Sequence, residues 1–391
     1  MTEYLIKGKK EDCYGCSACE KACPKKAITL VADREGFLYP VINKELCVEC
    51  GICKSVCPHD NALVCNEPQA VFAGQNKNNQ KLMSGSSGSM FILFAEKILE
   101  EHGAVSGCVW DNNLRATHIV TEKGQDVQKM QGSKYVQSNL NGVFEDIKAR
   151  LEKGQKVLFS GTPCQVDGLK RYLRKEYAEL FTIDLICHGV PSPALLEKYI
   201  EELENSKQSK VTELRFRNKA INGWRSQGTI KLDNGNLLDF SPFKHSYYNL
   251  YYMENCVSRY SCYDCKFASP KRTGDVTIGD FWNASDFVPE SIVQNGVSAL
   301  LINTEKGKAF FEAINESLLL YESTLPIAQK GNERLVKGGK VPPKRQDFYT
   351  KVKELGLEKV ADEYCKYRYL VPFVKKHMPR GVKKIMKKML G

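Results

Sequence analysis

The chain has 391 residues, which is long enough for two or three domains with sizeable buried cores. Apolar residues make up 42% and charged residues 26%, so the composition is that of a globular protein and excludes a largely disordered chain. The net charge of +11 is uneven, because residues 366–391 hold nine Lys and Arg and no acid, and the nearly neutral remainder argues against a nucleic-acid-binding protein.

The chain shows no sign of a membrane span or a secretory signal. No run approaches the roughly eighteen uncharged apolar residues that a span needs, and the best attempt, residues 90–95, stops at Glu96. Residues 1–10 lack the apolar core of a signal peptide. We therefore expect a cytoplasmic protein. In a reducing cytosol, sixteen cysteines indicate metal ligands rather than disulfides.

Eight of these cysteines lie in two copies of one pattern near the N-terminus, Cys-x-x-Cys-x-x-Cys-x-x-x-Cys-Pro. Between the copies, residues 27–31 and 37–41 are predicted to form short strands around a turn at Arg34-Glu35-Gly36. We expect this unit to end near residue 67. A cluster of four irons and four sulfides needs four thiolates, and in bacterial two-cluster proteins each Cys-Pro cysteine serves the neighbouring cluster.

The pattern therefore predicts two 4Fe–4S clusters. One would be held by Cys13, Cys16, Cys19 and Cys57, and the other by Cys47, Cys50, Cys53 and Cys23. The alternative, a zinc ribbon, needs two Cys-x-x-Cys pairs rather than two groups of three cysteines within seven residues. The segment closely resembles bacterial ferredoxins.

The next segment offers a choice between a linker and a phosphate-binding loop. A strand is predicted at residues 70–74, a polar stretch at 75–81 and an apolar helix at 90–101. Ser84, Gly85, Ser86, Ser87, Gly88 and Ser89 lie directly before that helix. Their composition alone suits a flexible linker. Small residues at a helix start also let backbone N–H groups approach a phosphate.

From residue 105 onwards the pattern is α/β. Predicted strands alternate with helices of about ten residues, which favours βαβ units and a mostly parallel sheet. The predicted strands are 105–110, 116–121, 156–160, 180–187, 275–279 and 298–303, and the predicted helices are 142–153, 166–175, 193–203, 245–255 and 306–315. Asn234-Gly235 between residues 229–233 and 237–241 indicates a hairpin. From residue 342 the chain is predicted to be helical.

Eight cysteines lie outside the two motifs, namely Cys65, Cys108, Cys164, Cys187, Cys256, Cys262, Cys265 and Cys365. Cys164 and Cys187 come at the carboxyl ends of predicted buried strands, where α/β sheets place their ligand-binding loops. Cys262 and Cys265 form a Cys-x-x-Cys pair. These four thiols would fit a third cluster, with ordinary buried thiols or a zinc site as the alternatives.

Several of these segments resemble a known family. Residues 132–138, Phe159 to Gln165 (with Thr-Pro-Cys-Gln), 184–193 (with Cys-His-Gly) and 275–282 look like the beta-subunit family of deazaflavin-dependent hydrogenases and dehydrogenases. More narrowly, they resemble its bacterial branch with a fused ferredoxin domain, which is often found among polysaccharide-biosynthesis genes. The resemblance covers about residues 1–330. It implies an α/β domain that holds FAD beside a 4Fe–4S cluster.

Carried over by position, the resemblance implies roles for particular residues. Cys164, Cys187, Cys262 and Cys265 match the cluster cysteines, while Cys256 does not. The flavin would be bound by the loop of Ser84, Gly85, Ser86, Ser87, Gly88 and Ser89, and by Gly132, Ser133, Lys134, Tyr135, Gly161, Thr162, Pro163 and Gln165. The predicted domains are 1–67 (two-cluster ferredoxin), 68–330 (FAD and iron–sulfur catalytic domain) and 331–391 (helical region). The expected fold class is α/β, or α+β over the whole chain.

His188 and Asp280 are the candidate catalytic residues, as proton donors to a substrate that is being reduced. The competing roles are a hydrogen bond that shapes the cluster loop for His188 and the cap of a turn for Asp280. Arg217, Lys219 and Trp224 are candidates for the wall of a substrate cleft, with ordinary packing and surface roles as the alternative.

The C-terminal segment carries an apolar stripe among its lysines, formed by Val374, Met378, Val382, Ile385 and Met389. Such a basic amphipathic helix suits an anionic membrane surface. The alternatives are a helix docked on the protein's own surface and an oligomer interface.

We therefore predict an iron–sulfur flavoprotein oxidoreductase that passes electrons between a ferredoxin-like or other redox carrier and an organic substrate. That substrate would be a small molecule or linked to a glycan. The alternatives are a non-catalytic electron-transfer subunit that serves a separate reductase or dehydrogenase, and a scaffold with vestigial clusters. The last is disfavoured because every ferredoxin ligand is present.

Overall fold

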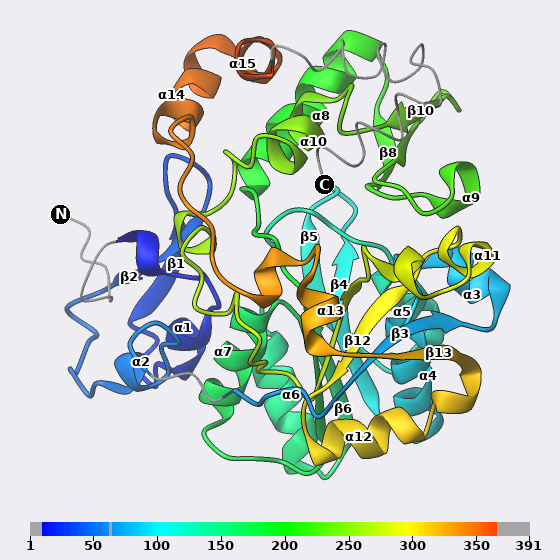
Figure 1. The fold of residues 1–391 in the computed structure, drawn as a ribbon. Helices are drawn as coiled ribbons and strands as arrows, with labels where there is room; N and C mark the ends of the chain where they lie inside the picture. Colours follow the sequence, from blue (N-terminus) through cyan, green and yellow to red (C-terminus); the bar gives the residue numbers. More distant parts are fainter. Residues whose placement is uncertain (1–9, 62–64, 366–391) are drawn as a thin grey trace.

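The computed structural model describes residues 10–61 and 65–365. Residues 10–61, the N-terminal unit, form the blue lobe at one side of the molecule (Figure 1). Two short helices carry the cysteine motifs, and the hairpin between the motifs is confirmed, with Ile28 opposite Ile42 and Ala32 opposite Leu38. The elements of the unit are α1 (Ala18–Ala22), β1 (Ile28–Ala32), β2 (Leu38–Ile42) and α2 (Ile52–Ser55).

The rest of the chain is built on an eight-stranded sheet, the central sheet, in the order β13-β3-β12-β11-β7-β6-β4-β5. Its strands are β3 (Ala70–Asn76), β4 (Ala104–Trp110), β5 (Ala116–Thr121), β6 (Val157–Gly161), β7 (Leu180–Leu185), β11 (Val276–Asp280), β12 (Ser298–Ile302) and β13 (Leu318–Ser323). The predicted α/β class is confirmed.

The prediction of a mostly parallel sheet was wrong. Within the described part of the chain, only the pairings of β4 with β6, β6 with β7 and β7 with β11 are parallel. The pairings of β4 with β5, β11 with β12, β12 with β3, and β3 with β13 are antiparallel. The three parallel pairings form a central block, because their connections contain helices, whereas β3 enters from the N-terminal side of the chain and runs against β12.

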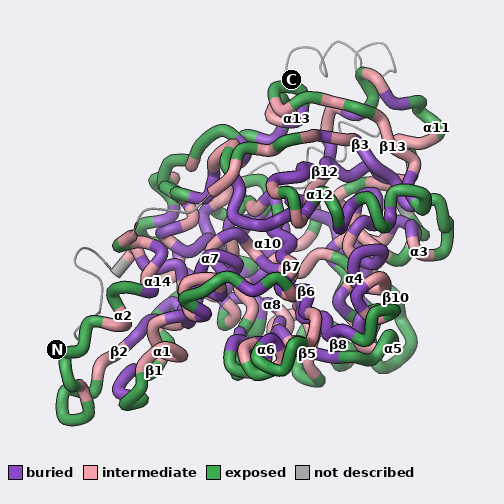
Figure 2. Tube along the Cα trace, turned by 90° about the horizontal axis from the view of Figure 1, so that it is seen from below, coloured by how far each residue is buried: buried purple, intermediate pink, exposed green. Residues whose placement is uncertain are grey.

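Helices cover both faces of this sheet. They are α3 (Asn79–Ser84), α4 (Phe91–Glu100), α5 (Gly124–Met130), α6 (Val143–Glu152), α7 (Pro163–Leu173) and α12 (Glu305–Glu312). On β6, Leu158 packs in the core beneath α4, while Val157 and Phe159 pack on the opposite side with α6 and α7. This alternation follows from the two-residue period of a strand. In Figure 2 the inner strands are buried along most of their length.

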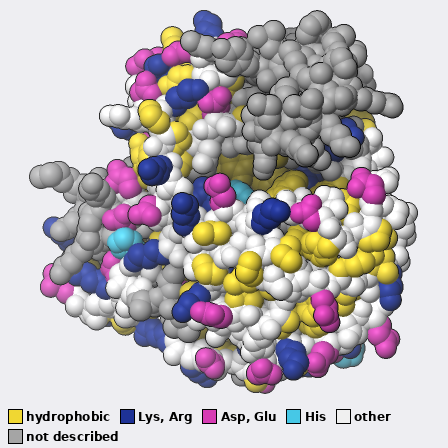
Figure 3. All heavy atoms as spheres, viewed as in Figure 1, with side chains coloured by type: hydrophobic (Ala, Val, Ile, Leu, Met, Phe, Trp, Pro, Cys, Tyr) yellow, Lys and Arg dark blue, Asp and Glu magenta, His cyan; other side chains and the backbone are white. Residues whose placement is uncertain are grey.

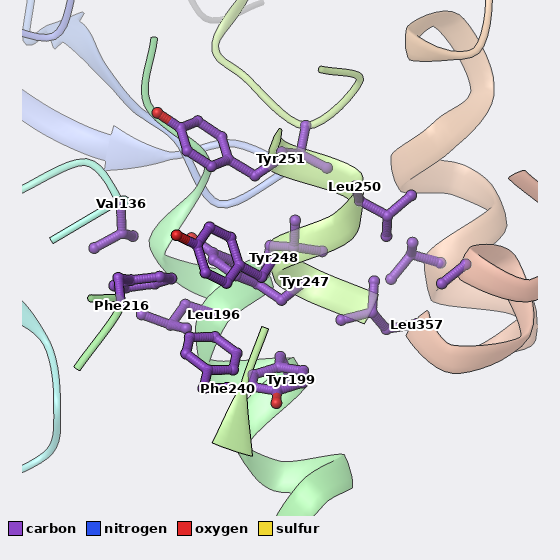
Figure 4. Packing of buried hydrophobic residues seen from close by; sticks show 14 of the residues in the cluster. Val136, Leu196, Tyr199, Phe216, Phe240, Tyr247, Tyr248, Leu250, Tyr251 and Leu357 are labelled. Atoms are coloured by element: carbon purple, nitrogen blue, oxygen red, sulfur yellow. The ribbon is translucent and has the colours of Figure 1, made fainter. Parts of the chain in front are cut away.

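A second layer lies above the central sheet in Figure 1, formed by a three-stranded sheet and helices. Its elements are α8 (Pro193–Lys207), β8 (Val211–Arg215), α9 (Lys219–Asn222), β9 (Gly228–Leu232), β10 (Leu237–Phe240), α10 (Ser246–Tyr252), α14 (Arg345–Leu355) and α15 (Leu357–Tyr364). The hairpin at Asn234-Gly235 is confirmed by the antiparallel pairing of β9 with β10. The core of this second layer is rich in aromatic residues. Tyr247, Tyr248 and Phe216 point toward one another beside Phe240 (Figure 4).

Two short helices, α11 (Glu290–Val293) and α13 (Leu325–Gln329), complete the described chain. Among the described residues, no helix is both long enough and apolar enough to cross a membrane. The basic segment predicted at residues 366–391 lies outside the described residues. The predicted domain boundaries at residues 67 and 330 stay predictions.

The N-terminal unit is docked on the rest of the chain through buried contacts. The segment just before α1 packs on α7 so closely that a Cβ atom at Gly168 would lie 2.9 Å from the Cβ of Cys16. Glu35, in the turn of the N-terminal hairpin, forms a two-pronged ion pair with Arg345 of α14, at 2.5 and 3.1 Å. Arg345 is 0% exposed and Glu35 is 9% exposed.

Replacing Glu35 with Ala would leave the buried Arg345 without its counter-charge. We expect Glu35→Ala to lower the free energy of unfolding by about 3–5 kcal/mol, because an unpaired buried charge is strongly destabilising. Glu363→Ala is the matched control, since it removes a half-exposed ion pair between Lys351 of α14 and Glu363 of α15. That control should cost less than about 1 kcal/mol. Urea unfolding of anaerobically prepared protein measures both, and equal losses would contradict the expectation.

Candidate functional site

The cysteines of the N-terminal unit line two neighbouring cavities. The first cavity contains Cys13, Cys16, Cys19 and Cys57 in its wall, and the second contains Cys23, Cys47, Cys50 and Cys53. The last cysteine of each motif therefore lies with the first three of the other motif, which is the exchange that the sequence predicts. Cys53 also lines the first cavity, so it stands between the two.

Local backbone geometry turns these thiols inward. Gly15, Ser17 and Gly51 adopt left-handed conformations, with φ of 67°, 65° and 73°. The amide of Gly15 donates to Cys13 Sγ at 3.4 Å, and the amide of Ala27 donates to Cys23 Sγ at 3.3 Å. Amides that point at sulfur stabilise the thiolate form, which is the form that binds iron.

Crowding of these thiols also fits a cationic cluster. Burial raises the pKa of Cys16, and the neighbouring Cys19 raises it further. Such buried thiols become thiolates when a bound metal compensates their charge. Among residues 10–61 and 65–365, no group of three or more His, Cys, Asp or Glu is arranged around a single metal ion. This agrees with a 4Fe–4S cluster, because its eight atoms hold the four ligands farther apart than a single ion would.

A third, much larger cavity lies at the carboxyl ends of β6, β7 and β11. It encloses about 1920 Å³ of space free of atoms, including its opening to solvent. Cys164, Cys187, Cys262 and Cys265 all line it. Burial raises the pKa of Cys187 to about 11 and that of Cys262 to about 12. Their assignment as ligands of a third cluster stays a prediction, but the four thiols do converge on one cavity.

Cys164 lies in the first turn of α7 (Pro163–Leu173), not in a loop before the helix, as the predicted helix at residues 166–175 implied. α7 begins at Pro163 because Thr162 and Gln165 form a capping box, in which the amide of Thr162 donates to Gln165 Oε1 at 3.0 Å. Proline is favoured at this first helical position. The Thr-Pro-Cys-Gln segment therefore fixes the start of α7 and with it the position of the thiol.

Cys262 and Cys265 lie in an irregular segment, residues 255–275, that buried arginines hold in place. Arg272 is 1% exposed and donates at 2.9 Å to Oδ1 of Asp184 on β7, three residues before Cys187. Arg259 is 0% exposed and donates to the carbonyl oxygen of Cys13 at 2.5 Å and to that of Leu38 at 2.9 Å. The segment is thus tied both to the central sheet and to the N-terminal unit.

Part of the serine-rich loop also lines the large cavity. Gly85, Ser86, Ser87 and Ser89 line it, whereas Ser84 and Gly88 do not. A Cβ atom at Gly88 would lie 2.1 Å from the carbonyl oxygen of Gly74, so this glycine permits close packing on β3. Ser86 Oγ accepts a hydrogen bond from the amide of Ser133 at 2.9 Å. This contact joins the loop to residues 132–135.

The remaining predicted flavin contacts also line the large cavity, namely Gly132, Ser133, Lys134, Tyr135, Gly161, Thr162, Pro163 and Gln165. Lys134 has a structural task as well, because its ammonium group lies 3.2–3.3 Å from four backbone carbonyl oxygens of residues 129–132. These carbonyls end helix α5, where a positive charge is favourable.

Both candidate catalytic residues line the same cavity. Burial lowers the pKa of His188, and the nearby Arg334 lowers it further. Asp280, at the end of β11, accepts from Arg217 Nη1 at 2.5 Å and from Trp224 Nε1 at 3.0 Å. With both carboxylate oxygens engaged, Asp280 orients Arg217. The predicted proton-donor roles of His188 and Asp280 stay predictions.

Sequence reasoning missed three residues of this wall. His118 on β5 donates from Nε2 to the carbonyl of Ser160 at 3.1 Å, and its Nδ1 is buried without a partner among the described residues. Gln137 joins Arg259 to the N-terminal unit. Tyr14 lines both the first cavity and the large cavity. Tyr14 lies directly beside Cys13 in the motif, which is the one signal that would have drawn attention to it.

Comparison with known proteins gives two family matches. Residues 154–326 match the family described as the C terminus of the coenzyme F420 hydrogenase/dehydrogenase beta subunit, and residues 12–61 match the 4Fe-4S dicluster domain. A search of curated proteins found no match. One similar solved structure is the F420-reducing NiFe hydrogenase complex from Methanosarcina barkeri, with 15% identity, a TM-score of 0.47, and coverage of 69% of this chain and 90% of that one.

The two family matches confirm the resemblance to the beta-subunit family with a fused ferredoxin domain. The chain is an iron–sulfur redox protein related to the beta subunits of these hydrogenases and dehydrogenases. Its N-terminal unit is a 4Fe–4S dicluster domain, which agrees with the two cysteine-lined cavities found there.

His118 gives a testable pH dependence. Burial lowers its pKa to about 4, from an ordinary value of 6.5. Between these two pH values the unfolded chain binds a proton that the folded chain does not, so stability falls as the pH drops below 6.5. Between pH 7.5 and 5.5, we expect the wild type to lose about 1 kcal/mol more stability than His118→Gln, whose amide can still donate to Ser160.

Urea unfolding at the two pH values measures this difference. His102→Gln serves as the control, because His102 is exposed at the end of α4. The control should keep the full pH dependence of the wild type. If the His118→Gln and His102→Gln variants lose stability equally between pH 7.5 and 5.5, His118 is not the group that titrates.

Proposed function

We propose that this relative of the deazaflavin hydrogenase/dehydrogenase beta subunits is an oxidoreductase that uses FAD and three 4Fe–4S clusters. It would pass electrons between a ferredoxin-like or other redox carrier and an organic substrate. In this proposal, residues 1–67 form the two-cluster domain and residues 68–330 form the flavin and third-cluster domain. The link to polysaccharide biosynthesis rests on the family resemblance alone.

The observation that carries this proposal is the unbroken series of three cysteine-lined cavities. Cys53 lines both the second and the first cavity, and Tyr14 lines both the first cavity and the large cavity. Tyr14 is 8% exposed and packs edge-on against Phe267, with ring centroids 5.1 Å apart. Phe267 itself lines the large cavity near Cys265. Neighbouring cavities in the series therefore share side chains of their walls.

The outer end of this series is accessible to a partner. Cys50 is exposed, and Val48, which also lines the second cavity, is 58% exposed. In Figure 2 the outer edge of the N-terminal unit around α2 is largely exposed. Acidic and basic side chains alternate on the face seen in Figure 3. A carrier that docks at this end would therefore contact an exposed apolar side chain beside the cluster site.

The inner end of the series fits a flavin. The large cavity combines apolar walls, such as Met90 and Ile278, with the polar serine loop and residues 132–135, which is the mixture of surfaces that a cofactor site needs. When bound there, FAD would exchange a hydride's two electrons with a substrate and single electrons with the clusters. The serine loop and residues 132–135 would hold the cofactor, and Cys164 and Cys187 would bring the third cluster to the same space.

The alternative function is a non-catalytic electron-transfer subunit that serves a separate reductase or dehydrogenase. An open cavity favours the enzyme, because a substrate must reach the flavin, whereas an electron-transfer subunit needs only cluster edges near its surface. The large cavity opens to solvent and has polar side chains such as His188 and Arg217 in its wall. These features favour a site for an organic substrate.

The third cluster predicts the iron content. Fully loaded protein should carry about twelve irons per chain, four for each of three clusters. The Cys262→Ser/Cys265→Ser double variant should retain about eight, because the dicluster domain keeps its own ligands. Cys108→Ser is the control, since Cys108 lines the large cavity but is not a predicted ligand. Iron analysis of anaerobically reconstituted protein measures these contents. About eight irons in both the wild type and the double variant would contradict the proposal of a third cluster.

The proposed flavin site implies that substitutions at two nearby serines change the FAD content differently. Ser86 lines the large cavity, while Ser84 is exposed and lies outside it. Ser86→Phe should place a ring where the cofactor binds and lower the FAD content of the purified protein at least tenfold. Ser84→Phe should leave the FAD content unchanged. Flavin absorbance per chain provides the measurement, and normal FAD in Ser86→Phe would place the cofactor elsewhere.

A further inference from the structure

Arg217 is held rigidly in the wall of the large cavity. Its side chain is 3% exposed, and Nη1 lies 2.5 Å from Asp280 Oδ2. Its guanidinium group also lies over the ring of Trp282, 5.6 Å from the ring centroid. Trp282 stacks on Trp224 with centroids 5.4 Å apart and an interplanar angle of 8°. Since Trp224 donates to the other oxygen of Asp280, these four side chains form one interlocked group.

The edge of Arg217 that Asp280 does not use makes no close hydrogen bond within the described part of the chain, although the hydroxyl of Tyr135 lies near the guanidinium. Nε and Nη2 are both buried and make no hydrogen bond to the described residues. These two groups lie on one edge of the planar guanidinium and form the fork that binds carboxylates and phosphates with two parallel bonds. Buried donors without acceptors are costly, because they have given up their hydrogen bonds to water and gained none in return. Because Arg217 lines the large cavity, an acceptor in that cavity would remove this cost.

The charge around this edge also favours an anion. Lys219, two residues along the chain, is 4% exposed and donates to the carbonyl oxygen of Ser87 in the serine loop at 2.6 Å. Burial and the positive charge of Arg217 lower the pKa of Lys219 to about 7. Asp280 is the carboxylate that pairs with Arg217. The two basic side chains, Arg217 and Lys219, therefore have one negative charge between them. An added negative charge would relieve the repulsion between the two basic groups.

We propose that the Nε and Nη2 edge of Arg217 binds an oxyanion, a carboxylate or a phosphate group, inside the large cavity. The proposal deepens the proposed function and rests on it, because the anion has two sources there. It is either the diphosphate of FAD, which the adjacent serine loop would approach, or an acidic group of the substrate. Asp280 and Trp282 act as positioning residues, since they hold the guanidinium in the wall of the cavity and engage it away from the Nε and Nη2 edge.

The variants Arg217→Gln and Arg217→Lys test this site. Gln removes the charge, while Lys keeps the charge and the pairing with Asp280 but lacks the fork. Arg215→Gln is the matched control, because Arg215 lies on β8 two residues away, is 53% exposed and pairs with Glu213 at the surface. Far-UV circular dichroism and retention of the dicluster iron establish that each variant is folded.

The first measurement distinguishes the source of the anion. Apoprotein is titrated with FAD and with riboflavin, which lacks phosphate. If the diphosphate binds Arg217, Arg217→Gln weakens FAD binding by about 10- to 100-fold and leaves riboflavin binding unchanged. Arg217→Lys gives a smaller loss, and Arg215→Gln gives none. If FAD binding is unchanged in all variants, the anion is not part of the flavin.

The second measurement uses inorganic phosphate as the probe, and calorimetry measures its binding to the protein as purified. If a substrate group is the ligand, wild type and Arg215→Gln bind phosphate saturably, and Arg217→Gln binds it at least tenfold more weakly. Equal behaviour of Arg217→Gln and Arg215→Gln in both measurements overturns the proposal. Failure of the wild type to bind any flavin overturns the proposed FAD function instead, and phosphate binding still tests Arg217.

Discussion

Three arginine side chains without access to solvent hold the irregular segment 255–275, and the arrangement of the cavities depends on them. Arg259 reaches the backbone of the N-terminal unit, Arg272 reaches Asp184 on β7, and Arg345 of α14 donates to the carbonyl of Ser258 at 2.9 Å. A buried guanidinium is tolerated only when its donors are engaged. The hydrogen bonds of these arginines therefore fix the segment in one position relative to its neighbours. In that position, Cys262 and Cys265 line the same cavity as Cys164 and Cys187.

The fold could be predicted where the pattern is local. Cysteine spacing identified the dicluster unit and the pairing of Cys57 with the first motif, and Asn234-Gly235 located a hairpin. Strands such as β6 and β7 appeared as short apolar runs. The antiparallel pairings of β3 with β12 and β13 were missed because they join segments far apart in the chain, and no local pattern encodes which strands become neighbours.

Most residues that the family resemblance assigns to a flavin line the large cavity, whereas the charged part of its wall was only partly predicted. Arginine is a charged residue that is usually exposed, and nothing near Arg217 in the sequence shows that its side chain is buried against Trp282. Gly88 is the converse case. Its place in a serine-rich loop suggested a phosphate contact, whereas the structure shows that a glycine is needed there for close packing, because a Cβ atom would clash with the backbone of β3. Burial depends on what packs above a residue, which only the three-dimensional fold reveals.

The shared wall at Tyr14 changes the kinetics expected of such a protein. An electron carrier that is free in solution must collide with its acceptor in a suitable orientation, and the rate then depends on concentration and ionic strength. A dicluster unit docked through Glu35, Cys13 and Cys16 has already completed that encounter. Under the proposed function, transfer across Tyr14 would be first order in the protein and insensitive to dilution. The one diffusional step that this proposal leaves would lie at the exposed Cys50 end, where a brief and weak contact with a carrier would be sufficient.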